Sequence, residues 1–308
     1  MSRGGRVSPG QRGVPGRADL LLLGVGVVGV STSGPLIAAT MVPALAVAFW
    51  RNALAWLVVA PTAVARRRAE TWGGVRARRV LGGSVAAGLA LAAHFALWVP
   101  SLHLTSVASS TALVSLQAVW TAVLARLGGQ AVTGRAWAGI GLALVGVVAL
   151  AGVDVSHSAR ALTGDALALA GGVFSAVYVV LGARVRRAVS TPTYTTLCYG
   201  TAAAALGAAC LATGAPLTGY AGADWARLAA LTLAAQLGGH TVFNLVLRRV
   251  SATVVSLVTL LEVPGAAIIA AAALGQTPPA GIVGGLVLVL AGVGLVVTAR
   301  ADVPAAPR

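Results

Sequence analysis

One carboxylate lies in the middle of an apolar stretch that is long enough to cross a bilayer. Glu262 is the only acid between Ser251 and Gln276, and it lies about 16 Å into that stretch at 1.5 Å per residue, near the midplane of a ~30 Å hydrocarbon core. A charge at that depth costs at least ~2.5 kcal/mol and is usually functional or paired. A carboxyl group that gains and loses a proton there could couple proton flow to substrate movement. A fixed ion pair or a hydrogen-bonded neutral acid is the structural alternative.

A permanent cation lies at a comparable depth in another apolar stretch. Arg51 is about nine residues from the outer end of the stretch Pro43 to Ala63. Arginine cannot lose its charge, and Glu262 is the only acid at a similar depth, so we expect the two to form an ion pair if their helices approach. Alternatively, Arg51 faces a water-filled cavity and binds a substrate carboxylate through two hydrogen bonds.

Two histidines, His94 and His240, also lie within apolar stretches. Because imidazole titrates near neutral pH, either one could relay protons. A histidine that is hydrogen-bonded to hold two helices together is the structural alternative. Their separation has no metal-ligand spacing, and we expect no metal.

Several other residues within apolar stretches could line a site. Gln117 and Asn244 could either join helices or face a polar cavity, and Trp120 and Tyr178 could form its apolar wall. Pro264 removes a backbone donor and kinks its helix, which exposes carbonyl groups that only protein or water can satisfy inside a membrane. Such an interruption indicates a site or a hinge, with a simple packing kink as the alternative.

The composition indicates a membrane protein. The chain is 58% hydrophobic and 9% charged, with a mean hydropathy of +0.90, whereas soluble domains carry roughly a quarter charged residues. We expect an all-α polytopic membrane protein with ten transmembrane helices. They are predicted at Leu20 to Ala39, Pro43 to Ala63, Val80 to Val99, Val107 to Arg126, Ala136 to Val153, Leu162 to Leu181, Thr191 to Leu211, Trp225 to Leu245, Ala252 to Leu274 and Gly281 to Val297.

The basic residues predict the orientation. All 22 are arginines, against seven acids, for a formal charge of +15. In a soluble protein this excess would suggest nucleic acid, but here the arginines cluster between apolar stretches, so no nucleic-acid partner is expected. If both termini are cytoplasmic, 19 of the 22 lie on the cytoplasmic side, as the positive-inside rule requires. Residues 1–18 are then a disordered basic cytoplasmic arm, and residues 301–308 are a cytoplasmic tail.

The two halves of the chain repeat at a constant offset of 146 residues. The matched pairs are Gly26 and Gly172, His94 and His240, Thr105 and Ser251, Ser110 and Ser256, Gly139 and Gly285, and Gly146 and Gly292. Each unit has five predicted crossings, an odd number, so the second unit must enter the membrane from the opposite face. We therefore expect two inverted five-helix repeats, residues 19–155 and 162–300, which is an architecture of secondary transporters with a site where the halves meet.

These stretches resemble the drug/metabolite transporter superfamily, specifically its EamA-type ten-helix exporters. The resemblance covers nearly the whole chain and rests on five segments. They are the segment 45–59 with Arg51, the presumed fourth and ninth helices at 104–125 and 250–275, and the glycine-spaced closing helices at 139–150 and 281–297. The chain departs from the family pattern at Gly129-Gln130 and Gly275-Gln276, where members usually carry Gly-Glu.

The resemblance implies a carrier in the inner (plasma) membrane that moves small metabolites, often amino acids or amphipathic compounds, usually outward and often in exchange for protons. The expected partners are thus a small-molecule substrate, protons and membrane lipids, and a homodimer is one assembly open to it. A flippase-like or scaffold protein without ion coupling is the alternative. The sequence contains no nucleotide-binding or nucleophile motif, so we expect neither an enzyme nor a cofactor.

Overall fold

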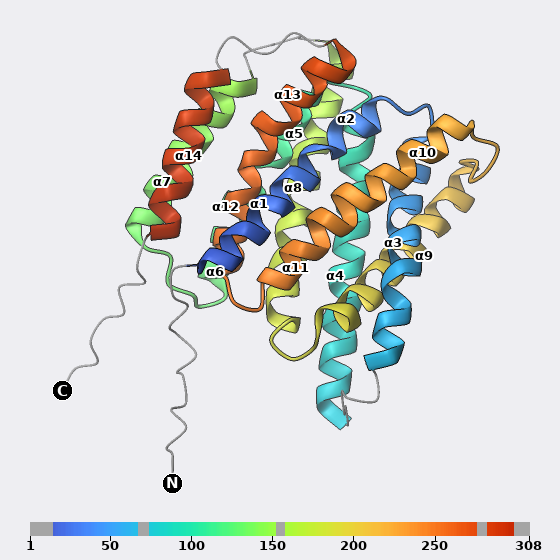
Figure 1. Cartoon of the computed structure of the whole chain (residues 1–308), viewed down its shortest axis with the longest axis horizontal. Helices are drawn as coiled ribbons and strands as arrows, with labels where there is room; N and C mark the ends of the chain where they lie inside the picture. The colour runs from blue at the N-terminus through green and yellow to red at the C-terminus, as the bar shows by residue number, and fades with distance from the viewer. Residues whose placement is uncertain (1–14, 67–73, 152–157, 276–281, 299–308) are drawn as a thin grey trace.

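The structure is a computed structural model that describes residues 15–66, 74–151, 158–275 and 282–298. The tail at 301–308 and most of the basic arm, residues 1–14, lie outside the described residues. The described part is all-helical, with 84% of it in helices and no strand. Figure 1 shows the helices packed side by side, with the first and last of them at the same side of the molecule.

Each predicted stretch falls on one helix or on a run of consecutive helices. In the first half these are α1 (Arg17–Ser31), α2 (Ser33–Ala38), α3 (Ala44–Arg66), α4 (Gly74–Ser101), α5 (Val107–Val114), α6 (Gln117–Leu127) and α7 (Gly134–Ala151). In the second half they are α8 (Ala159–Val185), α9 (Thr191–Thr213), α10 (Gly222–Leu231), the π-helix η1 (Thr232–Thr241), α11 (Val242–Val246), α12 (Ala252–Val258), the 3-10 turn η2 (Thr259–Leu261), α13 (Glu262–Leu274) and α14 (Ile282–Thr298).

Seven of these stretches are long and apolar enough to cross a membrane. They are Arg17–Ala38, Ala44–Ala65, Ala77–Ser101, Val107–Leu127, Ala159–Val185, Thr191–Thr213 and Ala252–Leu274. The helices α7 and α14 are apolar but shorter, and the stretch from α10 to α11 contains the π-helix. Large apolar side chains such as Leu21, Val28, Leu211 and Val283 are exposed on the outside, as lipid contact requires.

Serine residues begin four of the long stretches. Ser106, Ser158, Ser190 and Ser251 precede α5, α8, α9 and α12, and the hydroxyl of each accepts a hydrogen bond from the backbone N–H three residues later. This is the usual way to satisfy a donor that the first turn of a helix leaves free. Ser106 and Ser251 begin the two stretches that the repeat matches.

Three of the stretches are interrupted in their middle. The first breaks at Thr32, the fourth at Ser115 and Leu116, and the ninth at η2. Pro264 lies in the first turn of α13, directly after η2, where the missing N–H has no intrahelical partner to lose. The fourth stretch breaks in the same way without a proline, which the sequence did not predict.

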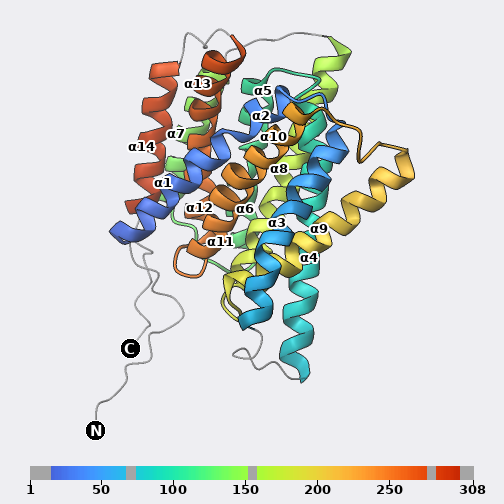
Figure 2. The same cartoon turned by 45° about the vertical axis from the view of Figure 1, so that its right-hand side comes forward.

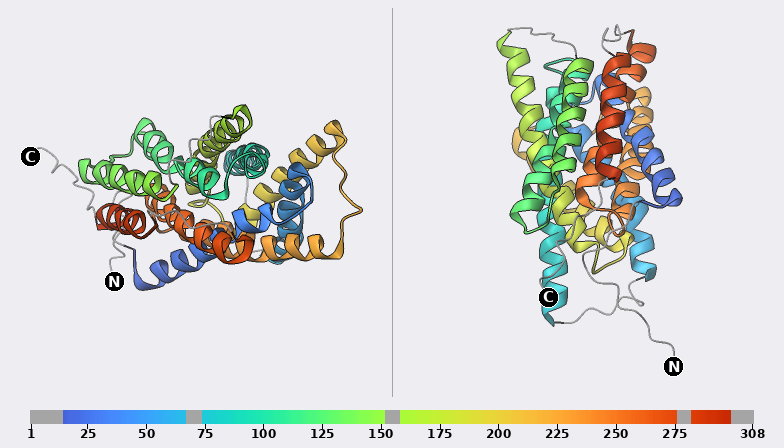
Figure 3. Two further views of the ribbon diagram at one scale, coloured as in Figure 1. Left: turned by 90° about the horizontal axis from the view of Figure 1, so that it is seen from above. Right: turned by 90° about the vertical axis from the view of Figure 1, so that its left-hand side faces the viewer.

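Glycines bring helices into backbone contact at both ends of the molecule. A Cβ added to Gly139 of α7 would lie 2.7 Å from the Gly292 carbonyl oxygen of α14, and one added to Gly146 would lie 2.7 Å from the Gly285 carbonyl oxygen. Seen from above in Figure 3, α7 and α14 lie together at one end, and α9 and α10 lie at the other. Figure 2 shows α9 crossing α3 and α4, where Gly200 contacts Trp56.

Candidate functional site

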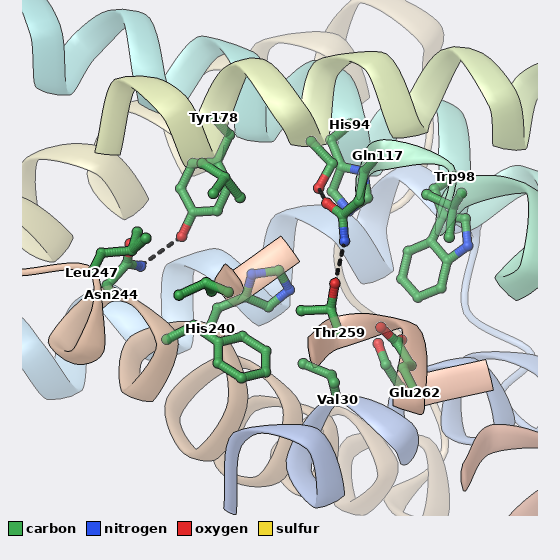
Figure 4. Close-up of a pocket in the computed structure, with 16 residues that line it drawn as sticks. Val30, His94, Trp98, Gln117, Tyr178, His240, Asn244, Leu247, Thr259 and Glu262 are labelled. Carbon is green, nitrogen blue, oxygen red and sulfur yellow. Dashed lines mark hydrogen bonds between the residues drawn. The ribbon is translucent and has the colours of Figure 1, made fainter. Parts of the chain in front are cut away.

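A cavity lies between α1, α2, α4, α5, α6, α8, η1, α11 and the interrupted ninth stretch. Its empty space amounts to about 590 Å³, with the open solvent at its mouth included. It is lined by Val30, Ser33, His94, Trp98, Val114, Gln117, Ser175, Tyr178, Val179, His240, Phe243, Asn244, Leu247, Val255, Thr259 and Glu262. In Figure 4, Tyr178 and Asn244 lie at one end of the cavity, and Trp98 and Glu262 at the other.

Glu262 is the only acid among the lining residues. It is the first residue of α13, directly after the 3-10 turn η2, so the break in the ninth stretch places its side chain in the cavity. Among the described residues, the ion pairs are Arg227 with Asp224 and Arg249 with Asp19, and Glu262 takes part in neither. Its carboxyl group is therefore available to a proton or a ligand.

Arg51 lies behind the cavity wall and is fully buried. Its Nε donates to Gln236 Oε1 at 3.0 Å, its Nη1 donates to Ser33 Oγ at 3.1 Å, and its guanidinium lies 4.0 Å above the ring centre of Phe95. Its Nη2 has no hydrogen-bond partner. The ion pair that we expected with Glu262 is not among the ion pairs of the described residues, and these neutral groups hold the guanidinium instead.

Both histidines reach the cavity. His94 Nδ1 lies 3.0 Å from the Gly171 carbonyl oxygen, which can only accept, so Nδ1 carries a hydrogen and the neutral ring presents Nε2 as an acceptor. Its ring is stacked on Trp98 with centroids 5.6 Å apart. His240, from η1, contacts the rings of Phe95 and Tyr178. No three described His, Cys, Asp or Glu side chains form a group that could hold a metal ion.

A chain of hydrogen bonds crosses the cavity between the two halves. Gln117 Nε2 donates to Thr259 Oγ1 at 2.9 Å, and Ser175 Oγ donates to Gln117 Oε1. Thr259 in turn donates to the Ser256 carbonyl oxygen at 2.6 Å. Gln117 is the first residue of α6, so the break in the fourth stretch places it here; Figure 4 shows its bond to Thr259.

The far end of the cavity is fixed by another amide. Asn244 Nδ2 donates to the Tyr178 hydroxyl at 2.6 Å, and the Asn244 backbone carbonyl accepts from Arg186 Nε at 2.9 Å. Asn244 Oδ1 is buried without a partner.

The predicted site residues fall into two groups. Glu262, His94, His240, Gln117, Tyr178 and Asn244 line the cavity together, although they come from five separate stretches. Three others do not line it: Arg51 lies behind Ser33, Pro264 is buried in the first turn after the break, and Trp120 is 42% exposed, a position that suits contact with lipid.

Sequence reasoning missed several lining residues. Trp98 lies near a stretch end, where an anchor at the membrane surface is the ordinary expectation, and it lines the cavity instead. Ser33, Ser175 and Thr259 have small hydroxyl side chains that are common in apolar helices, so their type gave no signal. Only the position of Ser33 beside Gly34 and Pro35 could have indicated it.

Comparisons with known proteins agree with this architecture. Residues 162–298 match the model of the EamA-like transporter family. No curated protein matches the sequence. A solved structure described only as "Crystal structure of protein" is similar over 90% of this chain and 96% of its own, with a TM-score of 0.71 and 19% sequence identity, a likeness of fold alone.

The matched residues begin in α8 and end with α14, so they include η1, the interrupted ninth stretch and Glu262. The resemblance inferred from the sequence is thereby confirmed in the second half. Residues 162–298 thus match the EamA-like transporter family, a family of the drug/metabolite transporter superfamily, and this match indicates a membrane transporter of that type.

Proposed function

We propose that the protein is a secondary active exporter of small metabolites, such as amino acids or amphipathic compounds, that works by alternating access and is coupled to protons. The observation that carries this proposal is the position of Glu262, which is the only acid lining a cavity between helices from both halves of the chain. It has no ion-pair partner in the described part of the chain. An unpaired intramembrane acid at such a position is typical of ion pathways.

In this mechanism Glu262 binds either a proton or the substrate. When the cavity faces one side, water reaches the carboxyl group and it exchanges its proton; when the cavity closes, the group must be neutral or covered by substrate, because a bare charge is costly in a dry cavity. Arg51 stays charged behind Ser33, outside the cavity lining, and contributes a positive electrostatic potential to the part of the cavity that holds Glu262. The remaining lining groups, His94 Nε2, Trp98 and the amides, orient the substrate.

Alternating access, in which the cavity opens first to one side of the membrane and then to the other, would follow from ten crossings arranged as two inverted repeats, residues 19–155 and 162–300. The glycine contacts between α7 and α14 support this arrangement. Gly139 contacts Gly292, which is the repeat partner of Gly146, and Gly146 contacts Gly285, the repeat partner of Gly139. Such reciprocal contacts are what a two-fold relation between the halves produces.

We place both termini on the cytoplasmic side of the cell membrane, on the arginine distribution. A cysteine in place of Arg78, near the beginning of α4, should then be protected from a membrane-impermeant thiol reagent in intact cells and react after permeabilisation. Labelling in intact cells would contradict this orientation. The native Cys198 and Cys210 are fully buried and give a low background.

Transport is tested in proteoliposomes with an imposed pH gradient and a mixture of amino acids and amphipathic amines, whose contents are measured by mass spectrometry. We expect at least one compound to accumulate against its gradient, and collapse of the pH gradient to abolish accumulation. If no compound accumulates while a fluorescent phospholipid is exchanged between leaflets, the flippase-like alternative replaces this proposal.

A further inference from the structure

The eighth apolar stretch contains a π-helical segment, η1, whose two ends face different structures. Gln236 lies in its middle and is bonded to α3, while His240 at its end and the following Phe243 and Asn244 line the cavity. A π-helix pairs each carbonyl with the N–H five residues later, is rare, and occurs mostly at functional sites. The pairing in η1 therefore decides which side chains reach the cavity.

Hydrogen bonds hold the middle of η1 against α3 and the following helix α11 against α8. Gln236 Oε1 accepts from Arg51 Nε at 3.0 Å, and its Nε2 donates to Asn52 Oδ1 at 3.3 Å. Asn244 Nδ2 donates to Tyr178 at 2.6 Å. Return to α-helical pairing would remove one residue from a turn and rotate everything after it by about 100°. Asn244 and Phe243 would then leave the cavity while Gln236 stayed bound to α3.

Thr241 carries a hydrogen bond that matches only the π-helical register. Its hydroxyl donates to the Gln236 carbonyl oxygen, five residues earlier, at 3.0 Å. In contrast, Thr232 at the other end of η1 donates to Leu228, four residues earlier, at 2.8 Å, as threonine does in an α-helix. Elsewhere in the described helices the threonine and serine hydroxyls that bond backward use carbonyls three or four residues away, as Thr201 does with Leu197.

A second helix supports the same hydroxyl. Tyr199 of α9 lies 2.9 Å from Thr241 Oγ1. Because the single hydroxyl hydrogen of Thr241 is given to Gln236, Tyr199 must be the donor in this pair. Tyr199 itself is fully buried, so loss of the Thr241 oxygen would leave its hydroxyl without that acceptor.

We propose that Thr241 is a positioning residue whose hydroxyl, held by Tyr199, keeps η1 in the π-helical register that turns His240, Phe243 and Asn244 into the cavity. The inference rests on the proposed function only in taking this cavity as the transport site. In this register Gly239 of η1 lies directly against α1, where a Cβ would come 2.6 Å from Val30 Cγ1.

The test measures the accessibility of one lining position. Phe243→Cys is made in the full chain, purified in detergent, and the rate of its modification by the small thiol reagent 2-aminoethyl methanethiosulfonate is measured, with the unmodified chain as background. Thr241→Val should slow this rate by up to about threefold, because loss of the net value of one hydrogen bond shifts the equilibrium between the two registers by that order and lowers the fraction in which position 243 faces the cavity. Thr241→Ser should restore it, and Thr232→Val, the matched control at the other end of η1, should leave it unchanged.

Equal rates with Thr241→Val, an equal slowing by Thr232→Val, or an inert Phe243→Cys would each overturn the inference. If Thr241→Val does not fold, Tyr199→Phe provides a second variant, which removes only the donor to Thr241 and should slow modification in the same direction; an unchanged rate again overturns the inference. No substrate is needed for these measurements, so they stand or fall independently of the transport assay.

Discussion

The fourth and ninth stretches match in sequence at an offset of 146 residues, and they break at nearby positions with different chemistry at the break. The fourth resumes as α6 with Gln117, a neutral amide that bonds to Ser175 on one side and to Thr259 on the other. The ninth resumes as α13 with Glu262, a carboxyl group without an ion-pair partner in the described chain. Both residues line the same cavity.

The difference shows how a repeat can divide two tasks. A fully bonded amide joins helices and keeps its geometry whatever the pH, whereas a carboxyl group at the same depth can change its charge. The first half thus holds the cavity together, and the second half supplies the group that can exchange protons. Variants of Gln117 should therefore act on stability, and variants of Glu262 on coupling.

A large effect on stability is expected from breaking the amide bridge. Gln117→Leu removes two buried hydrogen bonds and should lower the free energy of unfolding by about 2 kcal/mol, measured as thermal unfolding in detergent. Glu262→Gln should cost less than this because it removes no ion pair. Gln130→Leu, the same change at an exposed position after α6, should lie within about 0.5 kcal/mol of wild type. Equal losses at Gln117 and Glu262 would remove the contrast.

The glycine contacts between α7 and α14 test whether the two halves of the chain are related by the two-fold symmetry proposed above. Gly139→Ala and Gly292→Ala force a methyl group against backbone, and each should lower the free energy of unfolding by about 1–3 kcal/mol. Gly141→Ala and Gly284→Ala, on the same helices but facing open space, should instead raise it by up to about 1 kcal/mol. Unequal effects at Gly139 and Gly292 would argue against a reciprocal contact.

The smallest effect is expected at Asp224 of α10, which contacts the residues that follow the first interrupted stretch. Asp224 accepts hydrogen bonds from Thr40 Oγ1, the Met41 N–H and Arg227 Nη1. Burial raises the pKa of Asp224, but these three hydrogen bonds together lower it by more. The pKa of Asp224 therefore lies below its ordinary value.

The pH dependence follows from the sign of that shift. A carboxyl group with a lowered pKa stabilises the folded state above its ordinary value near 4, and this stabilisation is lost as the pH falls through the folded value. The thermal unfolding temperature should therefore be flat from pH 7 to about 5 and fall below about pH 4. Asp224→Asn should flatten the acidic decline, and an unchanged profile would show that Asp224 does not contribute.

Much of this architecture could be predicted because it depends on hydrophobicity and spacing. The apolar stretches, the mid-membrane depth of Glu262 and the matched glycines are properties of the sequence itself. The break before Gln117 could not be predicted, because no proline or glycine marks Ser115 and Leu116. The π-helix could not be predicted either, because pairing over five residues has no characteristic composition, and Thr241 shows its role only through the carbonyl that it reaches.

Partners between distant side chains were the other limit. Arg51 and Glu262 lie at similar depths, which made an ion pair the natural expectation. The structure instead holds Arg51 with Gln236, Ser33 and Phe95. Several polar groups lie at one depth, and the rotation of each helix about its axis decides which of them meet. That rotation is set by contacts between small residues, and many alternative packings of such a sequence would share these contacts.

The central claim is that Glu262 carries the coupled proton, and it is tested most directly by proton movement. Proteoliposomes containing a pH-sensitive dye receive a substrate identified in the transport screen. Wild type and Asp165→Asn, a control acid outside the cavity lining, should change the internal pH when substrate is added, and Glu262→Gln should not, whether or not it still binds substrate. Proton movement by Glu262→Gln at the wild-type rate would contradict the account.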